Sequence, residues 1–131
     1  MDVTRLNLAF AWLWIVLGFV SGAALGMRFK GENWMGGYTS FPRRLYRLGH
    51  ISFFGLGLIN FLFAVTLRVF AIKSPAIDFA GYAFIVGGVL MPICCVLMAH
   101  YPKLKPAALF AAPVSSLLVG GGLTLFLILK P

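Results

Sequence analysis

Two histidines, His50 and His100, are the residues of this sequence best suited to hold a metal ion or a cofactor. Each lies at the edge of a long apolar segment, three residues from a basic side chain: Arg47 for His50 and Lys103 for His100. In a helix, which rises about 1.5 Å per residue, each would lie about 4 to 5 Å inside that basic anchor. Imidazole is a good ligand for haem iron. Two histidines at equal depth on neighbouring helices therefore predict the axial ligands of one haem b, with haem iron as the only metal expected.

Two arginines precede His50 on the same predicted helix face. If one helix starts near Pro42 and runs into the next apolar segment, Arg43, Arg47 and His50 share a face. The same face continues to Gly57, where the missing side chain would leave room beside a flat macrocycle. Arg43 and Arg47 could pair with the haem propionates or, without a haem, with lipid phosphates. A histidine can also lie at a membrane interface with no ligand, turning its polar edge to the headgroups, and this interpretation stays open.

Membrane helices would have to position these residues. The 131 residues are 61% hydrophobic and 11% charged, whereas soluble domains are about one quarter charged. Four segments without Asp, Glu, Lys or Arg are long enough to cross a hydrocarbon core of about 30 Å: residues 6–27, 48–67, 79–99 and 107–129. Their short connections predict a single domain, an all-α integral membrane protein built as an antiparallel bundle of four transmembrane helices.

Basic residues are distributed unevenly among the connections. The first and third loops carry seven Lys and Arg residues, and the opposite side carries four. The positive-inside rule then predicts that these two loops are cytoplasmic and that both termini lie outside, in a multi-pass protein of the plasma or inner membrane. The net charge of +8 is explained by this topology and by contact with the lipid bilayer, without a nucleic acid as partner.

Small residues indicate how the helices pack. They recur every four positions in the first and fourth segments, as Gly18, Gly22 and Gly26 and as Ala112, Ser116 and Gly120. Such stripes let helix backbones approach closely in membranes, where the hydrophobic effect does not drive helices together. They indicate tight packing inside one bundle or, alternatively, a docking face for another subunit or a flat cofactor.

Two prolines and one amide introduce polar groups into the apolar segments. Pro92 frees the carbonyl of Gly88, and each such proline tends to kink its helix. Pro113 frees the carbonyl of residue 109 in the same way. The amide of Asn60 is expected to hydrogen-bond to a neighbouring helix. The adjacent Cys94 and Cys95 are expected to behave as small apolar residues.

Functional motifs narrow the choice mainly by exclusion. The sequence has no Walker loop, nucleophile elbow or dinucleotide fingerprint, and no acidic residue lies within a span. We therefore expect no stand-alone enzyme but a non-catalytic accessory subunit of a larger respiratory or electron-transfer membrane complex, bound to other subunits or to itself. A first alternative is a bis-histidine haem b protein that exchanges electrons with quinone. In this interpretation the chain resembles the small membrane cytochromes b in architecture, through His50 and His100. A second alternative is a small transporter or channel.

Overall fold

The computed structural model describes residues 2–28 and 30–130, and the described chain is all-helical. Its long helices are α1 (Val3–Arg28), α2 (Phe41–Phe70), α3 (Pro75–His100) and α4 (Pro106–Leu129), and a short 3-10 helix, η1 (Trp34–Gly36), precedes α2. All four long helices are long and apolar enough to cross a membrane, which confirms that the four predicted segments form such helices.

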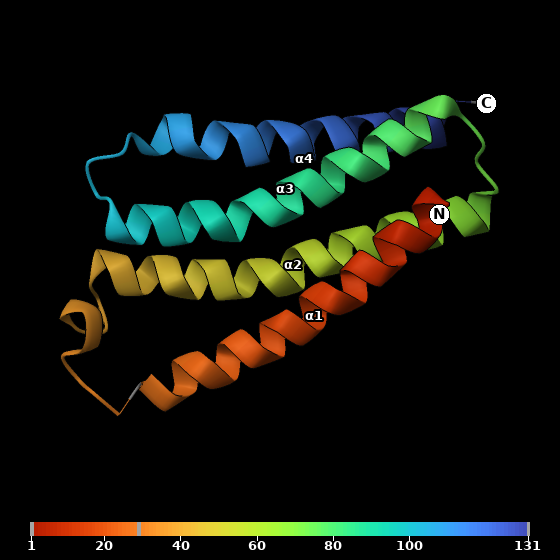
Figure 1. The fold of residues 1–131 in the computed structure, drawn as a ribbon. Coiled ribbons are helices and arrows are strands. Elements are labelled where there is room, and N and C mark those ends of the chain that lie inside the picture. The colour runs from red at the N-terminus through yellow and green to blue at the C-terminus, as the bar shows by residue number, and fades with distance from the viewer. Residues whose placement is uncertain (1, 29, 131) are drawn as a thin grey trace.

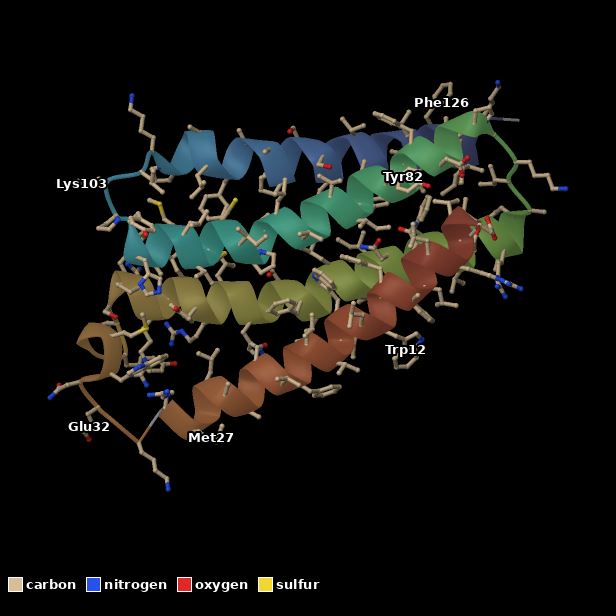
Figure 2. All side chains as sticks on the ribbon, viewed as in Figure 1. Trp12, Met27, Glu32, Tyr82, Lys103 and Phe126 are labelled. Atoms are coloured by element: carbon tan, nitrogen blue, oxygen red, sulfur yellow. The ribbon has the colours of Figure 1, made fainter. Side chains whose placement is uncertain are left out.

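Consecutive helices lie side by side and are joined at alternate ends (Figure 1). The α1–α2 and α3–α4 connections lie at one end, here called the loop end, where Glu32 and Lys103 are found (Figure 2). The opposite end, here called the terminus end, holds both chain termini and the short α2–α3 connection. The long, basic first loop therefore lies at the same end of the molecule as the α3–α4 connection.

Helix α2 begins seven residues before the predicted span, at Phe41. Ser40 caps it: the Ser40 hydroxyl accepts a hydrogen bond of 3.4 Å from the backbone N–H of Arg43. Pro42 occupies the first turn, where its missing N–H leaves no bond unmade. The start agrees with the helix expected from near Pro42, and it makes α2 one continuous helix from the first loop through the second apolar segment.

All four helices contribute to the core at the terminus end. Gly81 of α3 makes this possible, because a Cβ there would collide with the side chain of Val3 and lie 2.7 Å from Nδ2 of Asn7. The buried cluster consists of Val3, Phe63, Leu67, Ile77, Ala80 and Phe84, and Leu117, Leu123 and Leu127 of α4 pack against it. Large apolar side chains from each helix thus close this end.

Helix α4 packs on α3 through the small residues predicted for close contact. Ser116 donates a 2.7 Å hydrogen bond to the carbonyl of Ala83. A Cβ on Gly120 would lie 3.0 Å from the ring of Phe84, and one on Gly87 would lie 2.6 Å from Leu117. Ser116 and Gly120 are therefore used inside the chain, as the packing interpretation predicted, whereas Ala112 of the same predicted stripe is exposed.

Both carbonyls freed by the prolines receive a donor from a neighbouring helix. The indole Nε1 of Trp14 on α1 donates to the carbonyl of Gly88 at 3.1 Å. The Cys94 thiol on α3 donates to the carbonyl of Leu109 on α4 at 3.3 Å. Each proline thus creates an acceptor that ties two helices together.

The prediction that Asn60 hydrogen-bonds to a neighbouring helix is wrong. Its amide donates at 2.8 Å to the carbonyl of Leu56 in its own helix, not to a neighbour. The side chain is fully buried, and an acceptor one turn back along α2 is the nearest available group for a short polar side chain.

Candidate functional site

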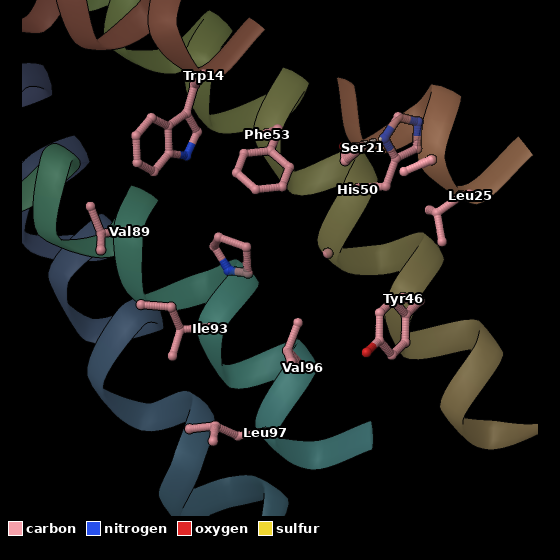
Figure 3. A pocket seen from close by; sticks show the side chains of 13 residues that line it. Trp14, Ser21, Leu25, Tyr46, His50, Phe53, Val89, Ile93, Val96 and Leu97 are labelled. Atoms are coloured by element: carbon pink, nitrogen blue, oxygen red, sulfur yellow. Dashed lines mark hydrogen bonds between the residues drawn. The ribbon is translucent and has the colours of Figure 1, made fainter. Parts of the chain in front are cut away.

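A groove of about 530 Å³ lies between α1, α2 and α3 towards the loop end (Figure 3). Its lining is apolar, and includes Trp14 from α1, Phe53 from α2 and Pro92 from α3. Ser21, Tyr46 and His50 contribute the only hydroxyl and imidazole groups among the lining residues. Pockets of this size, apolar with a few placed polar groups, are typical ligand sites.

The groove exists because α1 separates from the other helices. A Cβ on Gly18 would lie 2.8 Å from the Phe54 ring, and one on Gly22 would lie 2.8 Å from Cε1 of His50. One turn later, a Cβ on Gly26 would meet nothing within 4 Å. Figure 1 shows α1 diverging from α3 over this half of its length. The first helix therefore forms one wall of an open angle rather than part of a closed core.

His50 is held against α1. Its Nδ1 lies 2.9 Å from the Ser21 hydroxyl, which donates to the carbonyl of Gly18 at 3.0 Å. A hydroxyl has one proton to donate. When Ser21 gives that proton to Gly18, the second bond requires Nδ1–H of His50 as the donor. The neutral imidazole then has an unprotonated Nε2, which can accept a hydrogen bond.

Tyr46 joins the groove to α3. It lies one turn before His50 on α2, and its hydroxyl is 2.8 Å from Nε2 of His100. The ring also packs edge-on against Trp34 of η1, with centroids 6.1 Å apart. Tyr46 lines the groove, whereas His100 supports Tyr46 from outside it.

The structure gives the two predicted haem ligands different partners on different helices. At the level of Gly49, α2 faces α3 closely, because a Cβ there would lie 3.3 Å from that of Cys95. His50 follows Gly49 on α2 and therefore lies near the level of Cys95, at least five residues, or roughly 7.5 Å, from His100 along the helix axis. One iron ion bound by both rings would require both hydrogen bonds to break and His50 to leave α1.

The space expected beside Gly57 is filled. A Cβ at this position would lie 3.1 Å from the carbonyl oxygen of Ala11 and 3.3 Å from Ile15, so α1 occupies it. The face with Gly57, Phe54 and His50 is the one that α1 covers. Haem ligation by His50 and His100 stays a prediction, and the absorption spectrum of protein purified with haem available tests it directly.

Arg43 and Arg47 hold the first loop rather than line the groove. The Arg43 side chain is buried, with its guanidinium 5.7 Å from the ring centre of Trp34 and 5.4 Å from that of Tyr38. It also donates to the carbonyl of Glu32 at 3.5 Å. Arg47 lies 4.3 Å from the Tyr38 ring. Such cation–π contacts fold the loop back onto the start of α2.

Three groove residues were missed by sequence reasoning: Ser21, Tyr46 and Trp14. Tyr46 precedes His50 by four residues, a spacing that could have placed both on one helix face. Nothing in the sequence pairs Ser21 with His50, or Trp14 with the Gly88 carbonyl that Pro92 frees. Within the described chain, no group of three His, Cys, Asp or Glu side chains could hold a metal ion.

No protein-family model, curated protein or solved structure matches the chain. The groove and its two hydrogen-bonded pairs, Ser21–His50 and Tyr46–His100, therefore carry the functional argument.

Proposed function

We propose that this chain is a membrane-embedded accessory subunit that binds a lipid-soluble ligand in the groove between α1, α2 and α3. The larger complex would be respiratory or otherwise electron-transferring, and the subunit itself non-catalytic. The groove is the observation that carries the proposal: about 530 Å³ of apolar space with a hydroxyl–imidazole pair on each side. A lipid-soluble molecule with one polar end matches that lining.

The membrane arrangement that we propose is an antiparallel four-helix bundle with the loop end in the cytoplasm. That end carries seven basic residues and one acidic residue, Glu32, while the terminus end carries four basic and two acidic residues. Anionic lipids attract such a basic end, and the positive-inside rule places it in the cytoplasm. The polar end of the groove would then lie near the cytoplasmic headgroups.

A partner subunit has an available face on α4. This helix packs on α3 with one side only, and Gly120 and Pro113 are its buried residues. On the rest of its surface, Gly121 and Gly122 would have no atom within 4 Å of an added Cβ. Adjacent small residues on a lipid-facing helix permit another helix to approach closely. This outward glycine pair supports assembly with another membrane protein.

Isolation from the native membrane tests both parts of the proposal. A tagged chain extracted in mild detergent should migrate as a complex heavier than the monomer and should carry a lipid-soluble mass in native mass spectrometry. Val96→Trp would fill the groove and remove the bound mass. Val65→Trp is the matched control, since Val65 has similar exposure but does not line the groove. A ligand-free monomer would overturn the proposal.

A further inference from the structure

We infer that the groove holds one acyl chain of an anionic phospholipid, whose headgroup lies at the loop end beside Arg28. The inference rests on the proposed ligand-binding function and adds the chemical class of the ligand. It follows from how the polar side chains of the lining are already bonded, from the length of the groove and from the charge at its mouth.

The polar side chains of α2 in the lining are bonded within the protein rather than offered to a ligand. Nδ1 of His50 pairs with the Ser21 hydroxyl, and the Cε1–Nε2 edge of the same ring lies against Gly22 of α1. The Tyr46 hydroxyl is directed to His100 of α3. These groups tie the helices together, so the groove needs no polar atom from its occupant.

The rest of the lining presents carbon. Nε1 of Trp14 donates to the carbonyl of Gly88, which leaves the indole ring as a wall of the groove. No Asp, Glu, Lys or Arg lines the groove. Ile93 and Val96 line it and are also exposed on the outside of the helices. A hydrocarbon chain can therefore enter from the bilayer without crossing a polar barrier.

The length of the groove matches one leaflet of a bilayer. Its lining runs from Trp14 to Leu25 on α1 and from Val89 to Leu97 on α3, or about 12 to 16 Å at about 1.5 Å per residue. Half of a hydrocarbon core of about 30 Å is about 15 Å. In the proposed membrane arrangement, the groove thus extends from mid-membrane, where Trp14 and Val89 lie near the middle of their helices, to the loop end. A single acyl chain of that leaflet has this reach.

A helix of a partner protein is the competing occupant, and the groove is too narrow for it. A volume of about 530 Å³ over this length leaves a mean cross-section of roughly 40 Å², whereas a helix about 10 Å across needs about 80 Å². A partner helix could cover the groove but could not fill it.

The charge at the mouth of the groove selects the headgroup. Leu25 is the last lining residue of α1, and Arg28 follows it by three residues, a spacing that places neighbouring side chains on one helix face. Arg28 is exposed. The loop end as a whole carries seven basic residues and one acidic residue. Arginine forms charge-assisted hydrogen bonds with phosphate, and a basic segment beside the membrane attracts anionic lipids.

Native mass spectrometry of the full chain in mild detergent tests the inference, with dioleoyl phosphatidylglycerol and dioleoyl phosphatidylcholine as probes. We expect one phosphatidylglycerol to bind roughly fivefold more tightly than phosphatidylcholine, the effect of one basic side chain on an anionic headgroup. Val96→Trp should abolish this binding of both lipids, and Val65→Trp should leave it unchanged. Thermal unfolding of each variant checks that it is folded.

An arginine pair tests the position of the headgroup. Arg28→Gln should remove the preference for phosphatidylglycerol and leave the affinity for phosphatidylcholine unchanged. Arg68→Gln is the matched control, because Arg68 is also exposed and also lies in the last turn of its helix, but at the terminus end. It should leave the preference intact.

The outcomes separate the phospholipid from the groove. If phosphatidylglycerol binds no more tightly than phosphatidylcholine, or if its binding survives Val96→Trp or its preference survives Arg28→Gln, the inference is wrong. If the mass that Val96→Trp removes from protein of the native membrane is a different lipid-soluble molecule, the inference fails and the proposed function stands. If no bound mass responds to Val96→Trp, both fail.

Discussion

The two ends of this molecule are built from the same kinds of residue but are packed differently. At the terminus end, Phe63 and Phe84 pack with a ring-centroid distance of 5.2 Å, and all four helices close around them. Nearer the middle of the helices, where the groove towards the loop end begins, Trp14 and Phe53 also lie close, yet they line that groove. Aromatic content therefore does not decide which end is closed.

What differs along the molecule is the contact that glycines make between α1 and α2. Gly57 meets the backbone of Ala11, Gly18 meets Phe54 and Gly22 meets His50, while Gly26 meets nothing within 4 Å. The two helix backbones are thus closest at Gly57, where a glycine faces the backbone of the other helix. They lie farther apart where an aromatic or imidazole ring stands between them. A large side chain opposite a glycine acts as a spacer, and His50 is the last spacer before α1 separates.

The largest expected effect comes from placing a large side chain where the backbones of α1 and α2 cross most closely. Gly57→Leu would place a side chain against the backbone of Ala11, 3.1 Å from the Cβ position, and a backbone cannot move aside as a side chain can. We expect a loss of about 1 to 3 kcal/mol in the free energy of unfolding, the usual cost of overpacking, measured by titration from dodecyl maltoside into SDS.

Gly55→Leu is the matched control for that substitution. It lies two residues away on the same helix, and a Cβ there would meet nothing within 4 Å. It should leave the free energy of unfolding unchanged or raise it slightly, because leucine is the better helix former. Equal losses in both variants would mean that α1 does not cross α2 at Ala11.

A smaller effect is expected from the indole that bridges α1 and α3. Trp14→Phe keeps a ring in place but removes the donor to the Gly88 carbonyl. The cost should be roughly 0.6 to 2 kcal/mol in the same titration, as for other hydrogen bonds between membrane helices. Trp12→Phe is the control, since Trp12 is 58% exposed and points away from the other helices (Figure 2).

A double-mutant cycle with Pro92 identifies the cause. Alanine at this position would restore a backbone N–H to the Gly88 carbonyl. In the Pro92→Ala background, Trp14→Phe should therefore cost less than in the natural chain. If its cost is the same in both backgrounds, Trp14 stabilises the helices by packing and not by satisfying the carbonyl that the proline frees.

Sequence reasoning predicted most of the fold because hydropathy and charge depend only on local composition. The four apolar segments, the helix start near Pro42 and the carbonyl freed by Pro92 all follow from a residue and its near neighbours. The partners did not follow. Whether His50 faces Ser21 or His100, and whether Trp14 finds Gly88, depends on how each helix is rotated and on where α1 diverges, which small-residue contacts across helices determine.

Those contacts can be adjusted at the edge of the groove with a smaller effect on stability. Gly22→Ala would place a methyl group 2.8 Å from Cε1 of His50 and push the imidazole away from Ser21. Alanine also favours the helix by up to about 1 kcal/mol, so the net change in the free energy of unfolding should be below about 1 kcal/mol. The imidazole NMR signals of His50 should shift as the hydrogen bond to Ser21 lengthens. Gly26→Ala should raise stability and leave those signals unmoved, because nothing faces it.

The smallest effect is expected at the second proline-freed carbonyl. Cys94→Ala removes the thiol that donates to Leu109, and a thiol is a weak donor. The loss should be a few tenths of a kcal/mol, near the lower end for bonds between membrane helices, and smaller than the loss in Trp14→Phe. The two substitutions thus compare one device, a proline-freed carbonyl with a donor on the next helix, at the α1–α3 and α3–α4 contacts. If Cys94→Ala costs as much as Trp14→Phe, the indole bond between α1 and α3 is not the stronger of the two.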